Sequence, residues 1–162
     1  MFQGLEAEVA DEEPRDIEMG PESFQEMIEH LKAHAPNEAC GILAGTDGRV
    51  VRVYPMTNVE PTPYSYFMDP KEQFAVMKEM RKEGLSIVGI YHSHPATTPY
   101  PSRKDRDLAF YPEAATVIVS FPAGGAEPEA RAYRIAEDRV TPIPLVVRPR
   151  LAGEKSRKLS AT

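Results

Sequence analysis

Cysteine is almost absent from this sequence: Cys40 is alone among 162 residues, so no disulfide can form within the chain. A disulfide-stapled secreted scaffold is thereby excluded, and a reducing compartment is expected. Long hydrophobic runs are also missing, because no stretch approaches the roughly 20 apolar residues that a membrane-spanning helix needs. The N-terminus is acidic and does not follow the basic, then apolar, layout of a secretory signal. We therefore expect a cytoplasmic protein without a membrane partner.

Positive charge is in short supply as well. Lys and Arg number 19 against 25 Asp and Glu, and the formal net charge of −6 argues against a nucleic-acid partner. The charge is uneven, with seven acids and one base in residues 1–18 but five bases and one acid in residues 148–158. Short charge runs at chain ends are usually solvated. We expect an acidic mobile segment at 1–18, one domain at 19–147 and a basic mobile tail at 148–162.

The first regular element is a helix that starts near Pro21. Apolar residues recur there with the spacing of one helical face: Phe24, Met27, Ile28 and Leu31. Two starts are compatible with the sequence, either Pro21 in the first turn or a capping box made by Ser23 and Glu26. Pro36 ends the helix.

The rest of the chain reads as strands with two further helices. Asp69 and Pro70 begin a helix that ends at Gly84, with Phe74, Met77 and Met80 on its inner face, and a short helix follows from Ser102 to about Phe110. Apolar segments predict strands at 40–45, 49–54, 66–68, 85–91, 116–121, 130–135 and 140–147. This order predicts a single α/β domain, a mixed sheet flanked by helices.

The chemistry is concentrated where the apolar strand 85–91 gives way to polar residues. His92 and His94 are two apart, so on an extended strand both rings point to the same side. With Asp105 they form a ligand set that suits zinc and leaves a fourth position for water, as in a catalytic site. Two alternatives stay open: Asp105 merely completes a capping box with Ser102, or Asp107 replaces it as a weaker ligand.

A second carboxylate is placed unusually. Glu38 lies between the helix-stopping Pro36 and the buried strand that starts at Cys40, where a charged residue is uncommon. We interpret it as the proton acceptor for the water that the metal activates. The alternative is an exposed carboxylate in a turn.

Taken together, these segments resemble the JAMM (MPN-plus) metallopeptidase family. The resemblance covers roughly Pro21 to Phe121 and is carried by three motifs: Pro36-x-Glu38-x-Cys40-Gly41-x-Leu43-x-Gly45, Tyr91-His92-Ser93-His94-Pro95 and Pro101-Ser102-x-x-Asp105. Every functional position of the family signature is matched. The long insertions of the eukaryotic deubiquitinases are absent, so the chain is more similar to the compact prokaryotic members.

The resemblance implies a fold, a cofactor and a reaction. The fold is the JAMM/MPN sheet of the cytidine-deaminase-like type, and the cofactor is one Zn²⁺ per chain held by His92, His94 and Asp105. Glu38 is the implied general base, and Ser102 is expected to stabilise the oxyanion. The implied reaction is isopeptidase-like or deubiquitinase-like hydrolysis of a peptide or isopeptide bond after the Gly-Gly end of a ubiquitin-like or sulfur-carrier protein. No oligomeric state follows from the sequence.

Other functions remain open at this point. A hydrolase of small amides or cell-wall peptides would use the same residues, and a non-catalytic scaffold of the same fold would bind without cutting. A thiol protease built on Cys40 is disfavoured, because the start of a buried strand is a poor place for a reactive thiolate. His30 and His34 resemble half of a zincin motif, but Leu31 stands where that motif has Glu. We expect them on a solvated helix face.

Overall fold

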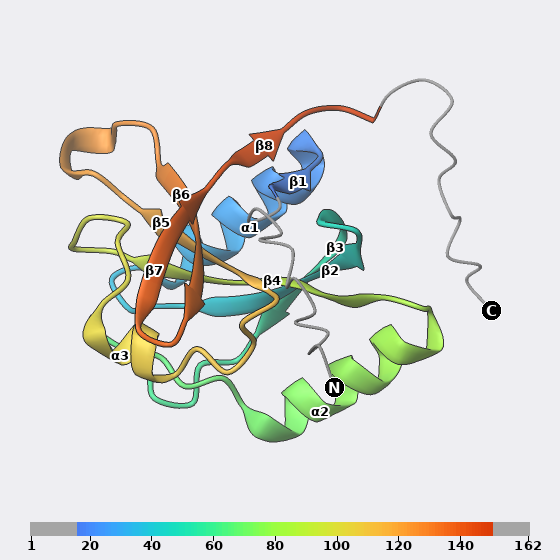
Figure 1. The fold of residues 1–162 in the computed structure, drawn as a ribbon. Coiled ribbons are helices and arrows are strands. Elements are labelled where there is room, and N and C mark those ends of the chain that lie inside the picture. The colour runs from blue at the N-terminus through green and yellow to red at the C-terminus, as the bar shows by residue number, and fades with distance from the viewer. Residues whose placement is uncertain (1–15, 151–162) are drawn as a thin grey trace, which may run out of the picture.

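All the strands join in one mixed sheet in the computed structural model, which describes residues 16–150 (Figure 1). The strands are β1 (Ile17–Met19), β2 (Cys40–Thr46), β3 (Arg49–Met56), β4 (Ser86–His94), β5 (Ala115–Ser120), β6 (Glu129–Ala136), β7 (Arg139–Ile143) and β8 (Leu145–Val147). The helices are α1 (Pro21–His34), α2 (Pro70–Lys82) and α3 (Arg103–Asp107), with a 3₁₀ turn at Ala123–Gly125. The sheet order is β7-β6-β5-β4-β2-β3-β1-β8. The expected mixed α/β domain is confirmed.

The two edge strands of the sheet are neighbours in the chain. β7 and β8 are separated by Pro144 alone, yet they lie at opposite edges, so the sheet must curl until its edges approach each other (Figure 1). The prediction of one strand over 140–147 was therefore wrong. Pro144 has no N–H for a ladder, and the chain passes there to the other edge, where the Pro144 carbonyl accepts from Ile17 N at 3.0 Å.

Helix α1 packs inside this curl. Its apolar face, formed by Met27, Ile28 and Leu31, is buried against residues of the sheet. Each such side chain contributes about 1.5–3 kcal/mol of hydrophobic stabilisation. Pro21 occupies the first turn and Gly20 is the N-cap without a side-chain hydrogen bond, so the Pro21 start is confirmed and the capping box was wrong.

Helix α2 begins as expected but packs differently. Asp69 Oδ1 accepts from Lys71 N at 3.0 Å, which satisfies one of the free N–H groups at the helix start. Met80 is buried, whereas Phe74 is 66% exposed, so the prediction of Phe74 on the inner face was wrong. Val76 packs against the core in its place. Among the described helices, none is long and apolar enough to cross a membrane.

Strand β4 is central to the sheet and carries the histidines within it rather than beyond its end. It pairs with β2 antiparallel, Cys40 opposite His92, and with β5 parallel, His94 opposite Ser120. The expected strand at 66–68 is reduced to a single bridge between Met68 and Asn58, because the proline-rich loop cannot supply a continuous ladder.

The expected terminal segments lie mostly outside the described residues. Where the acidic segment overlaps the described residues, Ile17 is buried, and Ile17 and Glu18 pair with β8 as part of β1. At the other end, Arg148 N donates to the Met19 carbonyl at 3.0 Å, and Arg148 Nε lies 2.8 Å from Glu18 Oε1. Ordered structure thus reaches into both predicted segments.

Candidate metal centre

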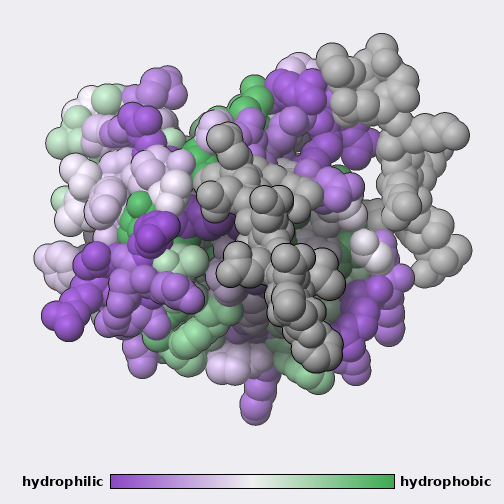
Figure 2. Space-filling view, viewed as in Figure 1, coloured by the Kyte–Doolittle hydropathy of each residue, from purple (hydrophilic) through white to green (hydrophobic). Residues whose placement is uncertain are grey.

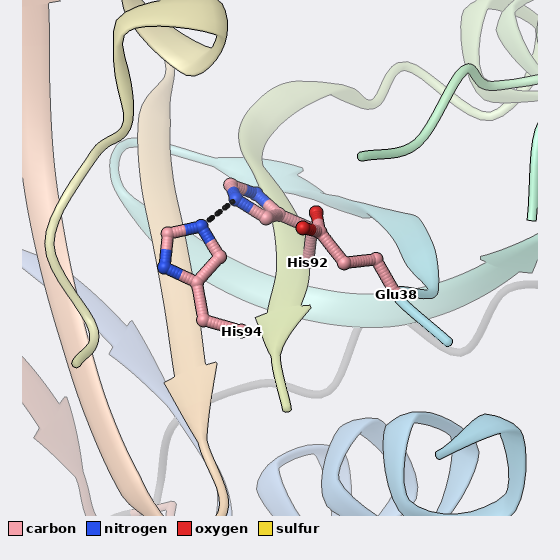
Figure 3. Close-up of side chains that lie close together, drawn as sticks. All are labelled: Glu38, His92 and His94. Carbon is pink, nitrogen blue, oxygen red and sulfur yellow. Dashed lines mark hydrogen bonds between the residues drawn. The ribbon is translucent and has the colours of Figure 1, made fainter. Parts of the chain in front are cut away.

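Two imidazoles meet at the end of β4. The ring centroids of His92 and His94 are 4.9 Å apart and their Nε2 atoms are 3.1 Å apart, both on one side of the strand (Figure 3). Both rings are buried, His92 completely. Ser93 alternates to the other side, where its N–H donates to the Ala39 carbonyl at 3.1 Å and its Oγ accepts from Ala39 N at 3.0 Å. The strand pleat therefore brings both histidines to one point.

Asp105 completes a triangle with the two rings. Its Oδ2 atom lies 3.2 Å from His92 Nε2 and 3.0 Å from His94 Nε2, and its side chain is 8% exposed. The donors of a tetrahedral zinc site, each about 2.0–2.2 Å from the ion, are about 3.3–3.6 Å from one another. The three donor atoms therefore fit one ion with a small outward movement.

The capping box and the triangle coexist. Ser102 Oγ accepts from Asp105 N at 3.1 Å, and Asp105 Oδ2 accepts from Ser102 N at 2.9 Å. The same Oδ2 atom faces both histidines, so the cap fixes the carboxylate instead of competing with the site. Asp107 is exposed on another part of α3 and does not join the cluster.

The hydrogen bonds of the rings determine which nitrogens can face a metal. The Thr98 carbonyl lies 3.0 Å from His94 Nδ1 and can only accept, so this nitrogen carries a proton and Nε2 is left to face an ion. Burial acts to lower the pKa of His94, but the hydrogen bonds to Asp105 and Thr98 outweigh it and raise the pKa, so without an ion Nε2 also carries a proton, which an ion would displace. Burial lowers the pKa of His92, which favours the neutral ring, although the nearby Asp105 carboxylate opposes this effect. For Asp105, burial acts to raise the pKa, but the hydrogen bonds from both histidines outweigh it and hold the pKa below its usual range.

Glu38 approaches the same point from the segment between α1 and β2 (Figure 3). It is 4% exposed, which excludes the alternative of an exposed turn carboxylate. One ligand atom from each of Glu38, His92 and His94 lies within 4.8 Å of the other two. The Asp105 carboxylate oxygen lies within 3.2 Å of both Nε2 atoms, well inside this 4.8 Å limit. We therefore favour Asp105 over Glu38 as the third ligand.

The carboxyl group of Glu38 is poised near neutrality. Burial raises its pKa to about 7, while the charge of His94 acts in the opposite direction. Its backbone is held by Thr62, whose carbonyl accepts from Glu38 N at 2.8 Å, and by Asn58, whose Nδ2 donates to the Glu38 carbonyl at 3.0 Å. Within residues 16–150, Glu38 Oε1 is buried without a hydrogen-bond partner. A buried oxygen of this kind is suited to receive a proton from a reactant.

A hollow of mixed polarity lies beside the donors. It is lined by residues of the 57–68 loop, of β4, of α3 and of the segment after α3: Tyr66, Ile90, His92, Asp105, Leu108, Phe110 and Tyr111. A second hollow, which is mainly apolar, continues it toward the start of α2 through Phe67, Met68 and Pro70. Figure 2 shows apolar surface in the lower centre of the molecule, in the region between α3 and α2. The ring centroid of Tyr66 lies 4.7 Å from that of His92, so the loop that ends at Tyr66 forms one wall of the site.

The competing sequence interpretations do not fit the structure. Cys40 is fully buried, and burial raises the pKa of its thiol to about 12, so a reactive thiolate does not form there. His30 and His34 lie on α1 near Tyr91, whose hydroxyl is 2.8 Å from His30 Nδ1. His30 is half-buried by this contact, so the expected solvated face holds for His34 only.

Comparison with known proteins agrees with this geometry. Residues 21–136 match the family described as prokaryotic homologues of the JAB domain. The chain is similar to the CysO-cysteine peptidase of Mycobacterium tuberculosis, with 44% identity over 123 residues, 75% of this chain and 84% of that protein. It is similar to the desampylase of Haloferax volcanii, with 33% identity over 111 residues, 64% of this chain and 80% of that protein.

A solved structure of a related protein has the same fold. The solution structure of a Desulfitobacterium hafniense protein matches 85% of this chain and 97% of its own, with a TM-score of 0.75 and 37% identity. The family match spans both histidines, Asp105 and Glu38. On its sequence, its fold and the convergence of these side chains, the chain belongs to the prokaryotic JAB-domain family.

Proposed function

We propose that this chain is a zinc metallopeptidase that hydrolyses a peptide or isopeptide bond after the Gly-Gly end of a ubiquitin-like or sulfur-carrier protein. The observation that carries the proposal is the triangle of His92 Nε2, His94 Nε2 and Asp105 Oδ2, with sides of 3.0–3.2 Å, and the buried Glu38 carboxylate beside it. Three ligands and a separate base are what metal-assisted hydrolysis needs.

The relatives narrow the substrate class. The mycobacterial relative is named a CysO-cysteine peptidase, and the Haloferax relative is named a desampylase. We extend to this chain the kind of substrate that these names indicate, a conjugate of a ubiquitin-like or sulfur-carrier protein. Zinc is proposed over other divalent ions because the family resemblance implies it, since two imidazoles and a carboxylate by themselves also suit other transition metals.

Each residue has one part in the reaction. Bound zinc supplies Lewis acidity and lowers the pKa of water toward neutrality. Glu38, with a pKa of about 7, removes the proton from the attacking water and later passes it to the departing amine. Ser102 Oγ accepts from Asp105 N, which leaves its own O–H to donate to the oxygen that becomes negative on the substrate carbonyl.

The burial of the donors favours a glycine tail. His92 is fully buried, His94 is 5% exposed and the Asp105 side chain 8%, so a carbonyl reaches them only by a close approach of the backbone. Glycine permits such an approach because it has no side chain. We place the residues before the glycines along the apolar second hollow, which Tyr66 and Phe110 line. A cytoplasmic location is also part of the proposal, and it rests on the single cysteine.

The test is cleavage of a fusion between a ubiquitin-like or sulfur-carrier protein and a C-terminal peptide, joined through Gly-Gly. The zinc-loaded protein should release the peptide, a chelator should stop release, and zinc should restore it. A matched fusion with two bulky residues in place of the glycines should be cut slowly. Absence of any cleavage would support a scaffold, and equal cleavage of a short free peptide would support a hydrolase of small amides.

A further inference from the structure

Three consecutive carbonyl groups follow His94, and each accepts a hydrogen bond from a different part of the fold. The Thr97 carbonyl accepts from Ser120 Oγ on β5 at 2.7 Å, and the Pro99 carbonyl accepts from Tyr133 Oη on β6 at 2.5 Å. The Thr98 carbonyl between them accepts from His94 Nδ1 at 3.0 Å. We call residues 97–99 with these two hydroxyl donors the carbonyl latch.

The latch acts on His94 through the position of one oxygen. The Thr98 carbonyl determines which ring nitrogen of His94 is protonated and how the ring is turned. The residues on either side of Thr98 are tied to the sheet by the hydroxyls of Ser120 and Tyr133. Without these ties, the Thr98 carbonyl would keep only its local contacts, among them the hydrogen bond from Tyr100 N at 2.8 Å.

The latch acts on Asp105 through the chain. After Tyr100 the latch leads to the buried Pro101 and to Ser102, which caps α3 and whose N–H donates to the Asp105 carboxylate. A movement of residues 97–99 would therefore displace the capping box, and with it the Oδ2 atom that faces both imidazoles. His94, which precedes this loop, and Asp105, which follows it, therefore both depend on the carbonyls of residues 97–99.

Tyr133 is well placed for this role, because its hydroxyl donates to the Pro99 carbonyl. The residue is 7% exposed, and its ring meets that of Tyr100 edge to face at 5.6 Å. Burial raises the pKa of the phenol, so the O–H stays protonated and remains a donor. The pairing of β5 with β6 is made by the backbone and does not need this hydroxyl.

From this arrangement we infer that Tyr133 and Ser120 are positioning residues of the metal centre, which set the orientation of His94 and Asp105 through the carbonyls of residues 97–99. The inference rests on the proposed metallopeptidase function. It assigns a role to two hydroxyl groups that touch neither the metal nor the substrate.

The test uses Tyr133→Phe and Ser120→Ala, each of which removes little more than a hydroxyl. Tyr54→Phe is the matched control, because its hydroxyl bonds Arg52 at 3.0 Å on β3, away from the site. The zinc dissociation constant is measured by competition with a chelator, and kcat and KM on the Gly-Gly fusion. Partners of metal ligands typically contribute about 10–100-fold to metal affinity. We expect about 10-fold weaker zinc binding in each variant, with kcat lowered and KM nearly unchanged.

The outcomes separate this inference from the function on which it rests. If wild type binds zinc but both variants bind it as tightly as Tyr54→Phe, the positioning role is refuted and the metallopeptidase proposal stands. If wild type binds no zinc, both fail. Thermal unfolding of the metal-free proteins guards against a folding defect: a variant that unfolds like the Tyr54→Phe control yet binds zinc weakly supports the latch.

Discussion

The molecule holds two pairs of histidines at almost the same separation. The ring centroids of His92 and His94 are 4.9 Å apart, and those of His30 and His34 are 5.0 Å apart. In the β4 pair the Nε2 atoms face each other and the Asp105 carboxylate lies within 3.2 Å of both. The rings meet edge to face in both pairs, at 61° in the β4 pair and at 75° in the α1 pair.

The difference between the pairs shows that closeness of rings does not make a metal site. His30 directs Nδ1 to the Tyr91 hydroxyl at 2.8 Å, and its pKa is lowered to about 4, first by burial and then by the charge of His34. His92 and His94 are buried together with an acid that stabilises positive charge between them. Convergent Nε2 atoms and a fixed carboxylate distinguish the β4 pair, and the following changes test that distinction.

The largest effect should come from removing a donor of the β4 pair. His94→Ala or Asp105→Ala should lose zinc and activity, and by more than the roughly 10–100-fold that an outer partner of a ligand contributes. His34→Ala should keep a full equivalent of zinc. Metal analysis of proteins purified without added metal measures both. A full metal content in His94→Ala would refute the ligand assignment.

Glu38→Gln should separate binding from chemistry. The amide keeps the size of the side chain but cannot take up a proton, so turnover should fall by about 10²–10⁴. Zinc content should stay near that of wild type. The cleavage rate and the zinc content, measured on the same preparation, show whether Glu38 acts in catalysis or in metal binding. Loss of zinc together with activity would make Glu38 a ligand instead of a base.

Ser102→Ala should slow the reaction by about 10²–10³, the usual effect of losing one oxyanion donor. It also removes the hydrogen bond to Asp105 N, which should lower the free energy of unfolding by about 1 kcal/mol. Zinc should remain bound, because the Ser102 backbone N–H still holds Asp105 Oδ2. Unchanged kcat with lowered stability would leave Ser102 as a helix cap alone.

The smallest effect concerns the α1 pair and pH. The pKa of His30 is about 4 in the folded chain against a reference value of 6.5, so the unfolded chain binds the extra proton first as the pH falls. The stability that neutral His30 contributes is complete above pH 6.5 and is lost between pH 6.5 and about 4. His30→Gln should show a shallower decline across that range than wild type or His34→Gln. Urea unfolding with a chelator present measures it, and identical slopes would contradict the assignment.

Much of the fold could be predicted because local patterns agreed with the tertiary structure. The expected strands 40–45 and 49–54 pair as β2 and β3, joined by a turn at Asp47 and Gly48, which are both at positive φ. Asp69 caps α2 as expected. The predictions failed where packing overrode local pattern. The apolar spacing of α2 predicts Phe74 on the buried face, but Val76 packs against the core instead. The expected strand 140–147 is divided at Pro144 into β7 and β8, which lie at opposite edges of the sheet.

The candidate site shows the same division. The spacing of His92 and His94 on a strand requires both rings on one side, and the sequence could show this without any tertiary contact. The location of Glu38 next to them could not be derived from local pattern, since it depends on the pairing of β2 with β4 over more than fifty residues of chain. The family resemblance supplied what the local pattern lacked. The roles assigned to these residues stay predictions until the variants above are measured.

The sequence by itself determined which chemical groups are present, their order, and the local geometry of short segments, because these depend on covalent spacing and backbone preference. Only the tertiary structure decided which groups meet. The Asp105 carboxylate serves both its helix cap and the two imidazoles, and the hydroxyls of Ser120 and Tyr133 hold the loop between them. Such meetings depend on strand order and register, which arise when the whole sheet folds around one core.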